Sequence, residues 1–203
     1  MKISAIIFAG LFCCLPLQAQ TFSVETISDS LSYLVLTTDS TTDRWQLPYP
    51  VYQFQTGDVD GDGNIDAMVG VIKKTRFHRE LGRRLFIFKN YRGKVRPLWM
   101  GSKLGGELVD FRCLSPTPPQ VKNLSSAPPQ GKGEEIAPAF IRALETGSDG
   151  RYTITDYKWE EFGMVFDHFI EKNIDQRDTA YEKFNSLCAG SGDGRHDAGT
   201  TAR

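Results

Sequence analysis

Four aspartates crowd into one glycine-rich stretch, and this stretch constrains the chain more than any other. They occupy positions 1, 3, 5 and 9 of a short loop and are Asp58, Asp60, Asp62 and Asp66. A hard cation such as Ca²⁺ takes about six to eight oxygen ligands, and a chain that folds back this tightly can supply several. Asn64 adds its carbonyl oxygen, and Gly63 permits the sharp turn. The spacing predicts a loop that holds Ca²⁺ as its cofactor.

The residues on both sides of this loop have the pattern of β-strands. Residues 51–55 alternate apolar and polar side chains, and residues 67–72 form a short, β-branched apolar run. An EF-hand would carry a bidentate acid at position 12 and continue into a helix, whereas position 12 here is Val69. The sequence therefore predicts a strand, a calcium loop and a strand. The alternative is a hairpin with Asp and Gly only as turn formers, but its carboxylates would repel one another without a compensating cation.

In this setting residues 54–71 resemble the FG-GAP/VCBS repeat of integrin-like β-propellers, whose loop has the form Asp-x-Asp-x-Asp-Gly-x-x-Asp. The resemblance implies a propeller-like blade and a role in binding or adhesion. It covers a single repeat. Closed propellers have about four to eight blades, and the chain after residue 19 has room for about three. Two arrangements stay open: one blade-like unit inside another antiparallel fold, or several chains that complete a sheet assembly together.

The rest of the chain is mostly β in pattern. Short aromatic or β-branched segments separated by Gly, Asn or Asp turns lie at 31–37, 84–89, 94–100, 107–112, 139–144 and 151–159. Residues 90–93 join the second and third of these as a hairpin. The predicted fold class is mainly β, an antiparallel meander resembling one to three propeller-like blades.

Near the C-terminus the apolar period changes from two to about 3.6. Apolar stripes at 162–170 and 180–188 predict C-terminal helices packed on the sheet. Thr179 and Glu182 have the spacing of a capping box for the second helix. Residues 162–166 are equally compatible with a last strand that leads into the first helix.

The N-terminal residues predict the compartment. Lys2 is followed by the apolar stretch 3–17 and by a cleavage pattern ending at Ala19, which predicts a cleaved signal peptide at 1–19. The expected address is therefore secreted or periplasmic, with no transmembrane segment. Bulky residues before Cys13 argue against a lipoprotein anchor.

Composition divides the remaining chain into a domain with one long loop and a tail. Residues 20–188 are predicted to form a single β-rich domain. Six of the ten prolines fall within 115–138, which predicts an exposed loop inside that domain. Residues 189–203 are rich in Gly and polar residues, which predicts a disordered tail.

The charge balance bears on possible partners. The whole chain has a net charge of −1, so overall charge gives no reason to expect specific nucleic-acid binding. Residues 73–103 nevertheless carry eleven Lys or Arg against the single acid Glu80. This basic segment predicts a surface for an anionic ligand, although strands with one buried face commonly expose charges on the other.

Cysteine and histidine usage limits the chemistry. Cys113 and Cys188 follow the signal peptide, and either a disulfide or two buried thiols is compatible with the sequence. Known nucleophile, phosphate-binding and zinc-protease motifs are absent from the sequence, so we expect no enzyme. The favoured hypothesis is a secreted calcium-binding module that binds a protein or a glycan. The alternatives are a self-assembling structural protein, which would be a homo-oligomer, and a small secreted hydrolase.

Overall fold

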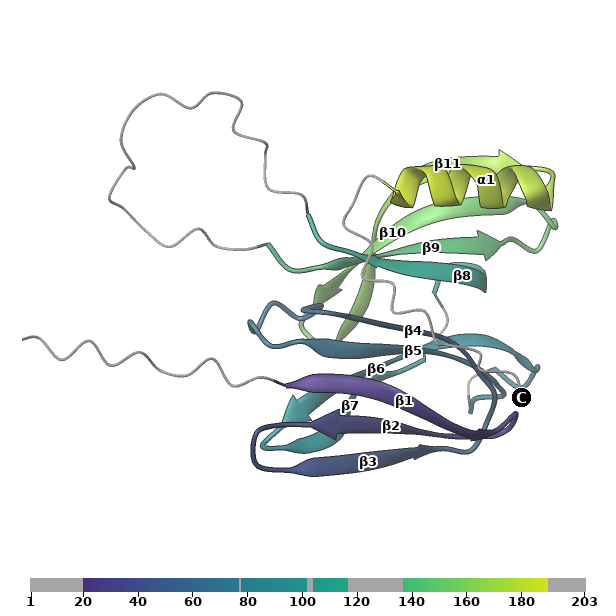
Figure 1. The fold of residues 1–203 in the computed structure, drawn as a ribbon. Helices are drawn as coiled ribbons and strands as arrows, with labels where there is room; N and C mark the ends of the chain where they lie inside the picture. The colour runs from purple at the N-terminus through teal and green to yellow at the C-terminus, as the bar shows by residue number, and fades with distance from the viewer. Residues whose placement is uncertain (1–19, 77, 102–103, 117–136, 190–203) are drawn as a thin grey trace, which may run out of the picture.

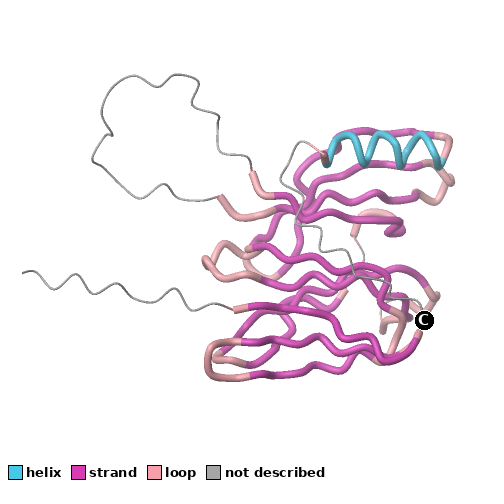
Figure 2. Tube along the Cα trace, in the orientation of Figure 1, coloured by secondary structure: helices cyan, strands magenta, loops and turns pink. Residues whose placement is uncertain are grey.

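The described part of the chain folds as antiparallel β-structure followed by one helix, as the ribbon and the tube show (Figure 1, Figure 2). The computed structural model describes residues 20–76, 78–101, 104–116 and 137–189. Their elements are β1 (Thr21–Ser28), β2 (Leu31–Thr37), β3 (Thr42–Leu47), β4 (Val51–Gly57), β5 (Asp66–Lys73), β6 (Gly82–Tyr91), β7 (Lys94–Met100), β8 (Glu107–Leu114), β9 (Phe140–Thr146), β10 (Tyr152–Glu160), β11 (Gly163–Ile174) and α1 (Arg177–Cys188).

The strands form three successive meanders. The first is β1–β3, the second is β4–β7 and the third is β8–β11, and within each meander every strand pairs antiparallel with the next. Among the described residues, the second and third are joined into one sheet by the single pair Arg83 and Leu108, where β6 meets β8. The predicted mainly β, antiparallel meander is therefore confirmed, and the described strands form no closed barrel.

The second meander is the middle layer of the molecule, as β5 demonstrates. Ala67, Val69 and Val71 enter a core shared with Phe22, Leu34, Leu36 and Leu47 of the first meander. Met68, on the opposite face of the strand, enters a core shared with β8, β9 and β10. Successive side chains of a strand point to opposite faces, so a strand between two layers must be apolar throughout. This requirement explains the continuous apolar run of β5.

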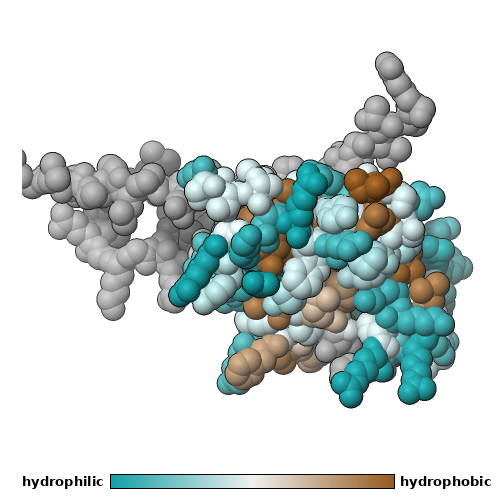
Figure 3. Space-filling view, turned by 90° about the horizontal axis from the view of Figure 1, so that it is seen from below, coloured by the Kyte–Doolittle hydropathy of each residue, from teal (hydrophilic) through white to brown (hydrophobic). Residues whose placement is uncertain are grey.

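The third meander is covered on its other face by α1, which lies above it in Figure 1. Leu144 and Ile154 pack there against Ala180 and Phe184, all with no exposed surface. The molecule is thus a stack of the first, second and third meanders and α1. Seen from below, the coloured part of the surface mixes hydrophilic and hydrophobic residues without one continuous apolar patch (Figure 3).

Residues 162–170 are not helical, so the prediction of the first of the two helices is wrong. Phe162 lies with Glu161, whose φ is 47°, in the turn after β10, and residues 163–170 belong to β11, which pairs with β10. The register of the pair shifts between Asp156 and Tyr157 and again between Ile154 and Thr155. Such bulges insert extra residues into β11, so Phe166 and Phe169, which are three positions apart in the sequence, lie side by side. A spacing of three imitates the period of a helix.

The second predicted helix is confirmed as α1, but its predicted start is wrong. The N-cap residue is Gln176, whose side chain makes no capping hydrogen bond, and Thr179 and Glu182 lie inside the helix. The sequence pattern did not predict β1 and β3, because exposed polar residues interrupt their apolar pattern.

Several predicted segments lie outside the described residues. They are the signal peptide at 1–19, residues 117–136 of the proline-rich loop and residues 190–203 of the tail. The described flanks of the loop, 115–116 and 137–138, belong to no strand.

Side chains of β4 connect the second meander to the third. Gln53 Nε2 donates to the carbonyl of Phe111 at 2.6 Å, and Gln55 Oε1 accepts from the amide of Cys113 at 2.6 Å. Gln55 is almost fully buried. Because buried backbone groups need partners, these glutamines satisfy β8 groups that face β4 without a backbone ladder.

Replacing the buried glutamine should weaken the fold. Gln55→Leu leaves the amide of Cys113 without this acceptor, and we expect the free energy of unfolding to fall by about 1–3 kcal/mol. The measurement is urea unfolding followed by far-UV circular dichroism. The control is Gln46→Leu at an exposed position of β3, for which we expect a change within about 0.5 kcal/mol. Equal effects of the two substitutions would contradict the role given to Gln55.

Candidate metal centre

The acidic loop connects β4 to β5 as a wide hairpin. Gly57 and Asp66 are the last residue pair of the β4–β5 ladder, so residues 58–65 lie between paired strands. The predicted order of strand, loop and strand is confirmed. Gly61 and Gly63 have φ values of 74° and 80°, a region that residues with a side chain rarely adopt. The glycines therefore allow the loop to curl around its carboxylates.

Asp58 organises the loop and attaches it to the third meander. Its Oδ1 accepts from the amide of Gly61 at 2.8 Å and its Oδ2 from the amide of Gly63 at 2.9 Å. Its backbone carbonyl accepts from the amide of Ala139 at 2.7 Å. Next to it, a Cβ atom at Gly57 would lie 2.6 Å from Cys113 Sγ, so only glycine fits there without a shift. The loop geometry and the packing of two meanders are therefore connected.

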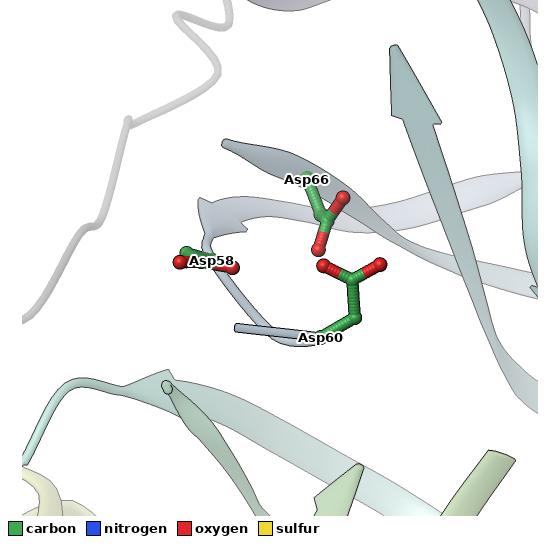
Figure 4. A group of neighbouring side chains, drawn as sticks. All are labelled: Asp58, Asp60 and Asp66. Atoms are coloured by element: carbon green, nitrogen blue, oxygen red, sulfur yellow. The ribbon is translucent and has the colours of Figure 1, made fainter. Parts of the chain in front are cut away.

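Three carboxyl groups come together at the base of the loop. Asp58, Asp60 and Asp66 each offer an oxygen, and these oxygens lie within 4.8 Å of one another. Figure 4 shows the carboxyl groups of Asp60 and Asp66 facing each other, with Asp58 beside them. The cluster contains no nitrogen or sulfur ligand, so its chemistry suits hard cations such as Ca²⁺ or Mg²⁺.

Asp66 has the most unusual surroundings of the three. It has no exposed surface, and its Oδ2 accepts from the amide of Val59 at 3.1 Å. Its Oδ1 is buried and has no hydrogen-bond partner. Burial, followed by the negative charge of Asp60, raises the pKa of Asp66 to about 7. A buried carboxylate oxygen without a donor is costly, and a bound cation would remove that cost. The residues therefore fit a metal ion.

A lysine already neutralises the outer side of the loop. Lys89 of β6 forms ion pairs with Asp60 and Asp62, the latter with Nζ to Oδ2 at 2.7 Å. Burial opposes the charge of Lys89, but the hydrogen bonds to both aspartates outweigh it and raise its pKa. Burial likewise acts to raise the pKa of Asp62, but hydrogen bonds from Lys89 and Asn64 leave it below its ordinary value. The loop thus attracts a cationic group of the protein itself.

The two remaining predicted ligands lie against each other. Asn64 donates from its backbone amide at 2.8 Å and from Nδ2 at 3.0 Å to Oδ1 of Asp62. The structure therefore brings together Asp58, Asp60 and Asp66, whereas Asp62 faces Lys89 and Asn64. Sequence reasoning did not include Lys89 in the site. Pairing of β5 with β6 places Lys89 next to the loop, because Ala67 lies opposite Phe88.

The basic segment 73–103 finds many partners within the molecule. Lys73 Nζ lies 4.3 Å from the ring centroid of Tyr49, and Arg84 pairs with Glu107 at 3.4 Å. The pairs of Lys94 with Asp43 and of Lys89 with the acidic loop continue this pattern. The structure does not test the predicted anionic ligand, which stays a prediction.

The two cysteines lie in different cores. Cys113 is in the core between the second and third meanders, and Cys188 is beneath α1. Both are buried, and no disulfide joins them. Burial, with smaller contributions from Asp66 and Asp58, raises the pKa of the Cys113 thiol to about 12. A thiol in that environment is a poor nucleophile.

Comparison with known proteins gives no relative for this chain: no family model, curated protein or solved structure matches it. In the described part of the chain, no helix has the length and apolar character needed to cross a membrane.

Removing the lysine should change both stability and metal affinity. Lys89→Met deletes the ammonium that faces Asp60 and Asp62, so the melting temperature in EDTA should fall because these carboxylates lose their counter-charge. Affinity for Ca²⁺, measured by isothermal titration calorimetry, should rise by about threefold to tenfold because no ammonium competes for Asp60. Lys94→Met removes an ion pair outside the loop and is the control. Unchanged calcium affinity in Lys89→Met would contradict this competition.

Proposed function

We propose that this protein is a secreted, non-catalytic binding module of FG-GAP/VCBS type whose acidic loop binds calcium. One observation carries the proposal. Oδ1 of Asp66 is buried without a hydrogen-bond partner, and it faces a cluster that already contains Asp58 and Asp60. A loop that served only as a turn would gain nothing from a buried, uncompensated carboxylate.

Calcium suits this loop better than other common cations. Zinc sites use mainly Cys and His ligands, and Mg²⁺ needs near-ideal octahedral geometry with several retained waters. Ca²⁺ accepts irregular sets of carboxylate and carbonyl oxygens, such as a curled loop supplies. Extracellular calcium modules bind with dissociation constants of about 10⁻⁴–10⁻³ M, so a site of modest affinity suits a secreted or periplasmic protein.

The proposed role of calcium is structural pre-organisation. The loop contacts the third meander through the hydrogen bond between Asp58 and Ala139 and through the close approach of Gly57 to Cys113. Neutralising the clustered carboxylates would hold the loop closed and fix the junction between the second and third meanders. A surface that is rigid before it meets its partner loses less conformational entropy on binding. The expected partner is a protein or a glycan.

The arrangement of the meanders supports the propeller-like part of the proposal. Propeller blades are antiparallel sheets of about four strands, and the second and third meanders each have four strands and pack face to face. Three meanders are fewer than a closed propeller needs. Fold likeness supports function only by analogy, so the proposal depends on the loop.

Replacing the buried acid should separate metal binding from folding. In Asp66→Asn, the new amide nitrogen can donate to Asp60, so the melting temperature in EDTA should stay the same or rise. The rise produced by saturating Ca²⁺ in the parent protein should be abolished. The measurement is differential scanning calorimetry in EDTA and in Ca²⁺.

The matched control is Asp62→Asn, because Asp62 lies outside the cluster of three. It should keep most of the calcium-induced rise. An equal calcium-induced rise in the parent and in Asp66→Asn would contradict the proposed ligand set.

A self-assembling structural protein is the second candidate, and β11 favours it. This strand is the last in its sheet, so one of its edges pairs with no described strand, and Val165 and Phe166 are exposed on it. Exposed edge strands can pair with a second chain. If copies join there, the mass from light scattering should rise with concentration, and Val165→Lys should abolish the rise. Ile27→Lys is the control, because Ile27 is an exposed residue of β1. A parent protein that stays monomeric at all concentrations would contradict this candidate.

A further inference from the structure

The third meander contains a pocket that the calcium proposal does not use. Its volume is about 460 Å³, within the range of small-molecule sites. Its lining includes Glu145 of β9, Tyr157 of β10 and, from β11, Met164, Phe166 and Phe169. The pocket therefore combines one acid with a mostly apolar and aromatic wall.

A rigidly held carboxylate forms the polar part of the pocket. Glu145 is 3% exposed, and its Oε1 accepts from the amide of Gly106 at 2.8 Å. Its Oε2 accepts from the hydroxyl of Tyr157 at 2.9 Å, and that hydroxyl accepts from the amide of Gly105 at 2.8 Å. No described Lys, Arg or His forms an ion pair with Glu145. Each carboxylate oxygen has capacity for a further hydrogen bond or charge contact.

Aromatic rings gather on the side of the pocket that β11 supplies. The ring centroids of Phe166 and Phe169 are 4.7 Å apart, and those of Tyr157 and Phe166 are 6.4 Å apart in an edge arrangement. Phe166 and Phe169 are 47% and 46% exposed, so about half of each side chain remains accessible. Lys172 Nζ lies 3.5 Å from the ring centroid of Phe169, so this ring already attracts an ammonium group.

We propose that this pocket binds a small alkylammonium ion, with Glu145 as its counter-ion and with Tyr157, Phe166 and Phe169 as the surrounding rings. Aromatic faces attract quaternary and methylated ammonium groups, and the attraction increases where water is excluded. A neutral ligand would cover the carboxylate of Glu145 without providing it a counter-charge, which is unfavourable. An anionic ligand would be repelled. The proposal is independent of metal in the acidic loop.

The test compares a cation with its neutral isostere. Choline and 3,3-dimethyl-1-butanol have the same shape, and isothermal titration calorimetry of the full chain should show choline binding at least tenfold more tightly. Glu145→Gln should weaken choline binding about tenfold or more, and Phe166→Leu should weaken it several-fold. Phe162→Leu is the matched control, because Phe162 is 89% exposed and does not line the pocket.

Three results would overturn the proposal. They are equal binding of choline and the alcohol, unchanged choline affinity in a folded Glu145→Gln protein, and no binding of choline or butylammonium at about 10 mM. If Glu145→Gln unfolds the protein, Phe166→Leu decides, because a half-exposed side chain can be shortened without loss of the core. Unchanged affinity in Phe166→Leu would then overturn the proposal.

Discussion

Burial of β5 on both of its faces is the constraint on which the rest of the structure depends. Val69 and Val71 close the core with the first meander, and Met68 closes the core with the third, so this strand holds three layers together. Its first residue is Asp66, which the same two-sided burial takes out of water. The packing of the core therefore buries the carboxylate that would gain most from a bound cation. The acidic loop lies directly before the first residue of this central strand.

This placement relates metal binding to the junction between layers. The loop contacts β4 and β5 through the chain, the start of β9 through Asp58 and Ala139, and β6 through Lys89. A cation at the carboxylate cluster would thus act on the second and third meanders together. The ammonium group of Lys89 compensates part of the same negative charge. The loop therefore keeps a counter-ion of its own and need not unfold without calcium. The proposed calcium site therefore has modest affinity, and its main effect is to make this junction rigid.

The sequence predicted the features that are local. The acidic loop, its flanking strands and most other strands follow from spacing and from the period of apolar residues. Lys89 could not be assigned to the loop, because its position depends on strand pairing that no local pattern encodes. The bulges in β11 changed the apparent period of Phe166 and Phe169, so a strand imitated a helix. No local pattern predicts the pocket at Glu145, since residues from three strands and from the segment 104–106 form it.

We propose above that calcium binds to the carboxylates of Asp58, Asp60 and Asp66. The most direct test is a crystal structure of the protein grown in millimolar Ca²⁺, with anomalous scattering used to locate the ion. We expect an anomalous peak about 2.3–2.6 Å from one oxygen of each of these aspartates, including Oδ1 of Asp66. A well-ordered loop with no peak at this position, with Oδ1 of Asp66 in contact with water or protein alone, would contradict it.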